Sequence, residues 1–220
     1  MADLDFLTSL HTSTKRDYVQ RVVEHDKAIC AERAKEWGYD YWDGDRRYGF
    51  GGYSYDGRWL KVAEEMAAHY GLKAGDRILD IGCGKAFLLY ELNQVVPGLE
   101  IAGIDISQYG IENAKEEVLP HLKVGNCTEL PWPDEHFDFV FSLNTFHNLQ
   151  NFELMAALME MQRVGKENRY VCVESYRNES EKANLLYWQL TCETFYRPEE
   201  WQWFFDQAGY QGDSGFIYFE

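Results

Sequence analysis

The segment RILDIGCGKAFLLYEL at residues 77–92 constrains the fold more than any other part of the sequence. It joins a hydrophobic run to an acid, then to closely spaced small residues, and then to an apolar stretch with helical spacing. A strand, a tight turn and a helix in this order are typical of open parallel sheets, whose ligands bind beyond the carboxyl ends of the strands. The loop at residues 80–86 is therefore the predicted binding site.

The same alternation of β-like and helical patterns continues along the chain. Strands that alternate with helices imply right-handed βαβ crossovers and a parallel sheet that is buried on both faces. The predicted strands are residues 77–81, 100–104, 121–124, 137–143 and 169–173, with a last strand in QGDSGFIYFE. The predicted helices are residues 60–70, 86–96, 108–118 and 151–164, with another that starts at Pro198.

The N-terminal part has a different character. Residues from about 14 to 36 place apolar side chains at helical spacing among charges, which predicts a helix. Residues 37–59 are dense in aromatic residues and glycine, which indicates turns and unusual backbone angles instead of a regular element. We therefore divide the chain into an extension, residues 1–56, and a core, residues 57–220.

The formal net charge of −16 at pH 7 restricts the partners of the protein. Such a surface repels phosphate backbones, and no stripe of lysine or arginine offsets it, so no nucleic acid is expected as a substrate. The five cysteines are odd in number and lack a CxxC pair, which favours reduced thiols in a cytoplasmic protein. Neither a basic leader nor a bilayer-length apolar run stands in the sequence, so no membrane association is expected.

The loop chemistry indicates the ligand. A dinucleotide fingerprint needs a third glycine where this chain has Phe87, so the loop reads as Asp80, Gly82 and Gly84 followed by a small residue. An acid before the loop repels phosphate but accepts hydrogen bonds from a cationic amine. Asp105, at the end of the next strand, is placed to accept both hydroxyls of a ribose. A nucleoside with a cationic amino-acid tail, S-adenosylmethionine (SAM), fits these requirements.

The motifs ILDIGCGKA, AGIDIS, VGNCTELPWPDEHFDFVFS and VCVES, in this order, resemble the class I SAM-dependent methyltransferase family over residues 57–220. The resemblance implies an enzyme that uses SAM and releases S-adenosylhomocysteine. The predicted fold is α/β, a single Rossmann-like doubly wound sheet, mostly parallel with an antiparallel C-terminal strand, plus the N-terminal helical and aromatic extension. The implied cofactor contacts are Asp80, Gly82 and Gly84 at the methionine end, Asp105 at the ribose, Ile106, Asn126 and Cys127 at the adenine, and Asn144. One departure is Asn126, where many members have aspartate; an amide carbonyl can still pair with the adenine amino group.

Methyl transfer from a sulfonium requires positioning of the acceptor, and a general base only for a hydroxyl or a protonated amine. In the family the acceptor lies beyond the fourth and fifth strands, here residues 142–149 and 174–177. His147 is the candidate base, because its ordinary pKa lies near neutrality; the alternative is that it starts a helix and bonds a carbonyl. Glu174 is either a substrate contact or a helix-cap partner. The Asn-Pro-Pro-aromatic motif of many amine methyltransferases is absent, and no essential metal is predicted.

Specificity is expected to come from two aromatic segments, residues 37–59 and about 175–197, which in this family fold over the SAM pocket as lids. The candidate substrate contacts in them are Tyr48, Tyr53 and Tyr176, together with Arg46 and Arg47, which with Arg58 suggest an anionic acceptor. The alternative is a small satellite core in which these arginines pair with the local aspartates Asp43, Asp45 and Asp56.

We predict O-methylation of a small anionic or sugar-like metabolite in an enclosed pocket. Natural-product phenols are close rivals as acceptors, and amines remain open. A second hypothesis is a SAM-binding sensor or accessory protein without transferase activity. Protein or RNA methylation is weakened by the negative charge and by the predicted lids, and exposed aromatic residues in the extension could form a homodimer surface.

Overall fold

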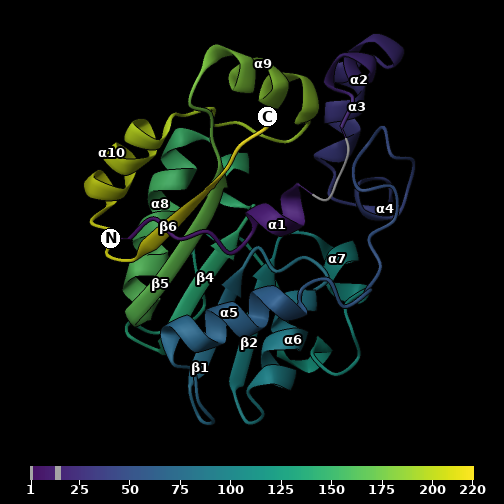
Figure 1. Cartoon of the computed structure of the whole chain (residues 1–220). Helices are drawn as coiled ribbons and strands as arrows, with labels where there is room; N and C mark the ends of the chain where they lie inside the picture. Colours follow the sequence, from purple (N-terminus) through teal and green to yellow (C-terminus); the bar gives the residue numbers. More distant parts are fainter. Residues whose placement is uncertain (1, 13–15) are drawn as a thin grey trace.

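A computed structural model describes residues 2–12 and 16–220 of the chain (Figure 1). Its centre is a six-stranded sheet in the order β3-β2-β1-β4-β5-β6. The strands are β1 (Arg77–Ile81), β2 (Glu100–Asp105), β3 (Leu122–Val124), β4 (Phe137–Leu143), β5 (Gly165–Glu174) and β6 (Asp213–Ile217). The α-helices are α1 (Thr8–His11), α2 (Tyr18–Glu24), α3 (Lys27–Ala34), α4 (Tyr39–Trp42), α5 (Leu60–Tyr70), α6 (Phe87–Val95), α7 (Gln108–Glu112), α8 (Asn151–Val164), α9 (Glu179–Trp188) and α10 (Pro198–Ala208), and short 3-10 helices are η1 (Leu119–His121) and η2 (Phe146–Asn148).

Every pairing in this sheet is parallel, and β1 lies at its centre between β2 and β4. The chain runs outward from β1 through β2 to β3 and then returns to β4 on the other side of β1. This is the switch point at which open α/β sheets bind ligands, beyond the carboxyl ends of the strands. The glycine loop that follows β1 lies at this point, as the sequence predicts.

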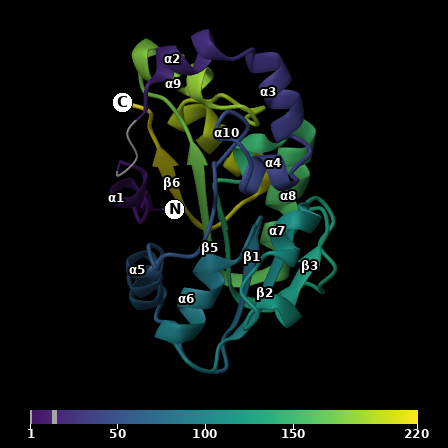
Figure 2. The same ribbon diagram turned by 90° about the vertical axis from the view of Figure 1, so that its right-hand side faces the viewer.

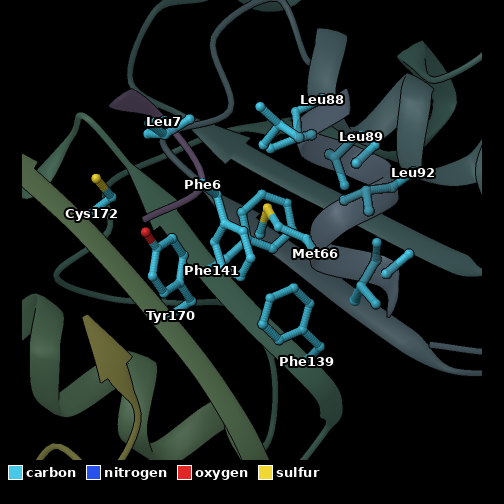
Figure 3. Close-up of a cluster of buried hydrophobic side chains, with 14 of the residues drawn as sticks. Phe6, Leu7, Met66, Leu88, Leu89, Leu92, Phe139, Phe141, Tyr170 and Cys172 are labelled. Carbon is cyan, nitrogen blue, oxygen red and sulfur yellow. The ribbon is translucent and has the colours of Figure 1, made fainter. Parts of the chain in front are cut away.

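Helices cover both faces of the sheet (Figure 1). Successive side chains of β4 point to opposite faces, so Phe139 and Phe141 join one buried cluster while Val140 joins the other. Figure 3 shows the first cluster, in which Met66 of α5 and Phe6 of the N-terminal chain lie close to these two phenylalanines. The second cluster is formed mainly with α8 and α10.

The predicted antiparallel C-terminal strand is wrong, because β6 pairs with β5 in parallel, from Tyr170 opposite Asp213 to Glu174 opposite Ile217. Two helices, α9 and α10, separate the two strands and return the chain to the amino edge of the sheet. A strand that starts at that edge must run parallel to its neighbour. The free side of β6 is partly paired with the N-terminal chain through a parallel bridge of Asp3 with Ser214.

The single helix predicted for residues 14–36 is also wrong. Two helices, α2 and α3, occupy the described part, and Thr14 lies outside the described residues. The break falls at His25, which is extended, and Asp26 then caps α3 by accepting from the backbone N–H groups of Ala28 and Ile29. An aspartate that caps a new helix competes with continuation of the previous one.

Other predictions differ from the structure in extent, among them strand β5, which begins at Gly165 instead of residue 169. Helix α7 ends at Glu112 instead of residue 118. At this end the side chain of Asn113 donates to the carbonyl of Tyr109. The aromatic segment, residues 37–59, contains the short helix α4, although the sequence predicted no regular element there.

Helices α2, α3, α4 and α9 gather at one end of the sheet (Figure 2). The arrowheads of β5 and β6 point toward this end, so the N-terminal extension and the α9 segment lie over the carboxyl ends of the strands. Within residues 2–12 and 16–220, no helix combines the length and the apolarity that a bilayer span requires.

Candidate functional site

The glycine loop between β1 and α6 has a backbone that favours small residues. Gly82 and Gly84 have φ angles of +82° and +54°, and Ala86 has +54°. A Cβ added at Gly82 would lie 2.0 Å from Oγ1 of Thr145, so this turn also requires glycine for space. The backbone N–H groups of Gly82 and Gly84 donate to the carbonyl of Ile104 and the carboxylate of Asp105, each over 2.7 Å. These bonds join the loop after β1 to the end of β2.

The carboxylate of Asp105 organises this region. One oxygen accepts from the N–H of Gly84 and the other from the N–H of Ser107, both over 2.7 Å. Burial raises the pKa of Asp105, while these two backbone donors lower it. Each oxygen retains a second lone pair, so the group can still accept from two ribose hydroxyls.

Asp80 lies at the end of β1 and is 5% exposed. Among the described residues, no hydrogen bond is made to its carboxylate. Burial raises its pKa well above the ordinary value, and the charge of Asp105 raises it further. A buried carboxyl group without partners is costly, and a cationic amine would satisfy it.

Trp42 of α4 lies against this loop. A Cβ added at Gly84 would lie 2.5 Å from Cη2 of the indole, and the indole Nε1 donates to Oγ of Ser107 over 2.8 Å. The Ser107 hydroxyl in turn donates to the carbonyl of Trp37. The aromatic segment therefore covers the glycine loop and the start of α7.

Lys85 lies in the glycine loop and binds residues of the aromatic segment. It is 5% exposed, and its ammonium donates to both oxygens of Asp43, at 2.6 and 2.8 Å, and to the carbonyl of Tyr53. The Tyr109 hydroxyl also donates to Asp43 over 2.8 Å. Sequence reasoning missed this pair; its only signals were a lysine within the loop and the aspartates of the aromatic segment.

His147 and Glu174, predicted from separate strand ends, lie together. Nε2 of His147 is 3.4 Å from Oε2 of Glu174, and both side chains are buried. The backbone N–H of Glu174 donates to Nδ1 of His147, so the neutral imidazole carries its proton on Nε2, facing the carboxyl group. Gln189 donates to the other carboxyl oxygen, whereas Oε2 has no hydrogen-bond partner in the part of the chain that the structure describes.

Burial drives both members of this pair toward their neutral forms. It raises the pKa of Glu174 to about 8 and lowers that of His147 to about 3. A carboxyl group with a pKa near the working pH is suited to accept and return a proton. In this arrangement Glu174 is better placed to accept a proton than His147, whose two nitrogens already face partners.

The residues predicted for the adenine lie at the rim of the site. Ile106 is 58% exposed next to Asp105, which leaves its side chain accessible for packing. The side-chain oxygen of Asn126 accepts from the N–H and the hydroxyl of Thr128, and burial raises the pKa of the Cys127 thiol to about 12. Asn144 follows β4 with a φ of +56°.

The residues predicted for the acceptor are dispersed. Arg47 pairs with Asp45 and Arg58 with Asp56, as the satellite-core alternative expected. Tyr48, Tyr53 and Tyr176 occupy three different places: Tyr48 packs on the buried cluster of Cys30 and Ala34, Tyr53 accepts from the indole of Trp59, and Tyr176 is buried in the sheet core. Arg46 donates to the carbonyl of Gly49 and lies over the ring of Trp188.

Comparison with known proteins gives one family. A family model described as a methyltransferase domain matches residues 72–209. An uncharacterized methyltransferase of Schizosaccharomyces pombe is 37% identical over 113 residues, which cover 46% of this chain and 40% of that protein. Demethylmenaquinone methyltransferase of Symbiobacterium thermophilum is 34% identical over 128 residues, which cover 54% of this chain and 50% of that protein. The chain thus spans half or less of the length of these curated relatives.

The fold also matches solved structures. The YcgJ protein of Bacillus subtilis superposes with a TM-score of 0.55 at 20% identity, over 70% of this chain and 68% of that chain. At this identity the likeness concerns the fold, and it agrees with the parallel sheet and its central switch point.

Proposed function

This chain belongs to the class I SAM-dependent methyltransferase family, and from that premise we propose that it transfers a methyl group from SAM to a small-molecule acceptor. The observation that carries the proposal is the buried carboxyl group of Asp80, beside the glycine loop at the switch point, to which no described residue donates a hydrogen bond. The α-amino group of SAM is a cation of the kind that this carboxylate needs.

The residues present fit this cofactor. Asp80 and the Gly82–Gly84 turn would hold the methionine end, Asp105 would accept the ribose hydroxyls, and Ile106 would pack on the adenine. Asn126, Cys127 and Asn144 would complete the site at its rim. When bound, SAM supplies an already activated methyl group, so the chain contributes orientation, exclusion of water and proton handling.

The two aromatic segments would act as lids. Residues 37–59 cover the glycine loop through Trp42 and the Lys85–Asp43 pair, and the segment at about 175–197 contains α9 over the carboxyl end of β5. Because the indole of Trp42 lies against Gly84, we propose that this segment shifts when SAM binds and then closes over it. Closure would keep water away from the reacting atoms.

We propose a hydroxyl group as the methylated atom. A hydroxyl must lose its proton, and the His147–Glu174 pair is a buried proton acceptor at the end of β5. Glu174 would accept the proton, and His147 would hold Glu174 in place and share its charge. Arg46, which lies over the ring of Trp188 between the two aromatic segments, favours an anionic or sugar-like small molecule over a bulky polymer.

A phenol or amine acceptor is the nearest alternative, and the relative named for demethylmenaquinone supports a small molecule as the acceptor class. The alternative from another class is a SAM sensor without turnover. The closed lids are compatible with it, since a sensor also benefits from a segment that moves on binding.

The test is an acceptor panel of sugars, phosphorylated sugars, hydroxy acids, phenols and amines, incubated with SAM and analysed by mass spectrometry. Addition of one methyl group to a hydroxyl-bearing compound supports the proposal. Methylation of amines alone would overturn the assignment to oxygen. If the protein binds SAM but methylates no compound of the panel, the sensor is favoured.

A further inference from the structure

Three arginines surround Trp188 at the end of α9. The guanidinium carbons of Arg16, Arg21 and Arg46 lie 5.4, 4.6 and 5.3 Å from the centroid of its ring. Arg21 also donates through Nε to the backbone carbonyl of Trp188 over 2.9 Å. We call these four residues the arginine cluster. Such a concentration of positive charge is unexpected in a chain with a net charge of −16.

Two members of the cluster, Arg21 and Arg46, stand without an acidic partner in the part of the chain that the structure describes. Arg47 and Arg58, from the same aromatic segment, each pair with a neighbouring aspartate at 2.8 and 2.5 Å. Within residues 2–12 and 16–220, neither Arg21 nor Arg46 forms an ion pair with a carboxylate. Their hydrogen bonds go to backbone carbonyls of Trp188, Arg46 and Gly49, which leave several of their N–H donors free.

The arrangement is electrostatically unfavourable by itself. Burial, and to a smaller extent the nearby charge of Arg46, together lower the pKa of Arg21 to about 10. Burial also lowers the pKa of Arg46 and that of Lys27, which lies near Arg21. Cation–π contacts with a single indole stabilise the guanidinium groups only weakly. An oxyanion between the guanidinium groups would relieve their repulsion.

The arginine cluster borders the proposed reaction site. Gln189, the residue after Trp188, donates to Oε1 of Glu174, and the charge of Arg16 acts on the Glu174 carboxyl group. Helices α2 and α9, which carry Arg21 and Trp188, lie together over the carboxyl ends of the strands (Figure 2). A group bound at the cluster is therefore close to the His147–Glu174 pair.

We propose that Arg21 and Arg46, around Trp188, bind an oxyanion group of the methyl acceptor, a carboxylate or a phosphate. This inference rests on the proposed function and adds to it the class of acceptor: a hydroxyl compound with an anionic group a short distance from the methylated oxygen. Trp188 provides a flat apolar wall for the carbon skeleton between the two groups. Arg47, named from the sequence for this purpose, is instead neutralised by Asp45.

The competing explanation is that the cluster only packs α2 against α9. In that case Arg21 and Arg46 would contribute to folding and not to the binding of anions. Arg46 lies at the surface, although its guanidinium group packs over Trp188. Among the described residues its side chain donates only to the carbonyl of Gly49, so Arg46→Gln tests binding with little risk to the fold. Arg58→Gln is the matched control, since Arg58 is exposed on the same segment but pairs with Asp56.

The experiment is a calorimetric titration of inorganic phosphate, and separately of acetate, into the full chain saturated with S-adenosylhomocysteine at low salt. For the wild type we expect a dissociation constant on the order of 1 mM for the preferred anion. We expect binding about tenfold weaker in Arg46→Gln and weaker still when Arg21→Gln is added, because each charged hydrogen-bond donor contributes more than about 1.4 kcal/mol. The preferred anion shows whether the acceptor carries a phosphate or a carboxylate.

The outcomes separate this inference from the proposed function. Equal anion binding by the wild type, Arg46→Gln and the double variant would overturn the anion subsite, as would equal loss in Arg58→Gln. Failure of the wild type to bind S-adenosylhomocysteine would instead refute the cofactor site. If the Tm of Arg21→Gln is lower than that of the wild type, Arg21→Lys replaces it in the titration. This variant preserves the charge and is expected to retain most of the anion affinity.

Discussion

The ammonium group of Lys85 lies 2.6 Å from Oδ2 of Asp43 and joins the glycine loop to the aromatic segment of the N-terminal extension. The lysine is almost fully buried, while the aspartate is one-quarter exposed. The loop proposed to hold the cofactor and the segment proposed to cover it are thus mechanically connected through one ion pair. Movement of one is expected to change the other.

The first prediction concerns this ion pair. Asp43→Asn leaves the buried ammonium of Lys85 without its counter-charge, which we expect to lower the free energy of unfolding by about 2–4 kcal/mol. Hydrogen exchange in residues 37–59 should accelerate, because the same change leaves a single amide oxygen where Lys85 and Tyr109 now donate to two carboxylate oxygens. Thermal unfolding and exchange mass spectrometry measure the two effects.

The control for this prediction is Asp45→Asn. Asp45 pairs with Arg47 on the exposed surface of the same segment, so its loss should destabilise the fold far less than the loss of Asp43. Equal destabilisation by the two variants would show that the Lys85–Asp43 pair has no special role.

The second prediction concerns the contact between Trp42 and Gly84. Gly84→Ala places a Cβ at a φ of +54° and 2.5 Å from Cη2 of the indole, so we expect a loss of about 2–4 kcal/mol. Trp42→Phe removes Cη2, and in that background the same alanine should cost only the backbone term of about 1–2 kcal/mol. Chemical unfolding of the four proteins gives the coupling energy, and strict additivity would contradict the contact.

The third prediction concerns stability and pH. The pKa of Glu174 is raised to about 8 from an ordinary 4.5, so its contribution to stability is complete below about 4.5 and is lost as the pH rises through 8. His147 acts in the opposite sense, since its pKa is lowered, but it is neutral in both folded and unfolded states above about pH 7. From pH 7 to 9, therefore, only Glu174 of this pair contributes, and the comparison with Glu174→Gln removes the contributions of all other groups.

Over that window the wild type should lose about 1 kcal/mol of stability more than Glu174→Gln, which is ~2–4 °C in Tm. Melting curves at pH 7, 8 and 9 for both proteins provide the measurement. If the Tm of the two proteins changes equally between pH 7 and 9, the carboxyl group of Glu174 titrates at an ordinary pKa.

The fourth prediction concerns proton transfer. Glu174→Gln and His147→Ala should each lower kcat with a hydroxyl acceptor by about 10²–10⁴-fold and leave the affinity for SAM unchanged. His147→Gln should be milder than His147→Ala, because an amide can still contact the Glu174 carboxyl group. Turnover close to the wild-type rate in both Glu174→Gln and His147→Ala would return the pair to a purely structural role.

The sequence predicted those parts of the fold that depend on local patterns. Strand β1, the glycine loop and α6 were found where the hydrophobic run, the small residues and the helical spacing placed them, and Gly71 ends α5 with the left-handed backbone expected of a C-cap. The predicted direction of β6 was wrong, because the direction depends on a crossover through two helices and not on the residues of the strand itself.

The candidate site shows the same division. His147 and Glu174 were each named from their positions at strand ends, and parallel strands bring such ends together. The Lys85–Asp43 pair and the clustering of Arg21 with Arg46 around Trp188 join residues that are far apart in the chain. No local pattern predicts such pairs. The ion pairs of Arg47 and Arg58, in contrast, can be predicted from the sequence, since each arginine has an aspartate two residues before it.

The most direct test of the account is calorimetric titration of S-adenosylhomocysteine into the wild type and Asp105→Asn. Asparagine keeps one oxygen for one of the two backbone donors, Gly84 or Ser107, but turns an amino group toward the other donor and the ribose. We therefore expect a stability loss of about 1–3 kcal/mol and an affinity that falls by about 100-fold. We expect one site per chain in the wild type, and this loss of affinity in a variant that still unfolds in one cooperative transition. Absence of binding by the wild type, or equal affinity in the two proteins, would contradict the proposed cofactor site.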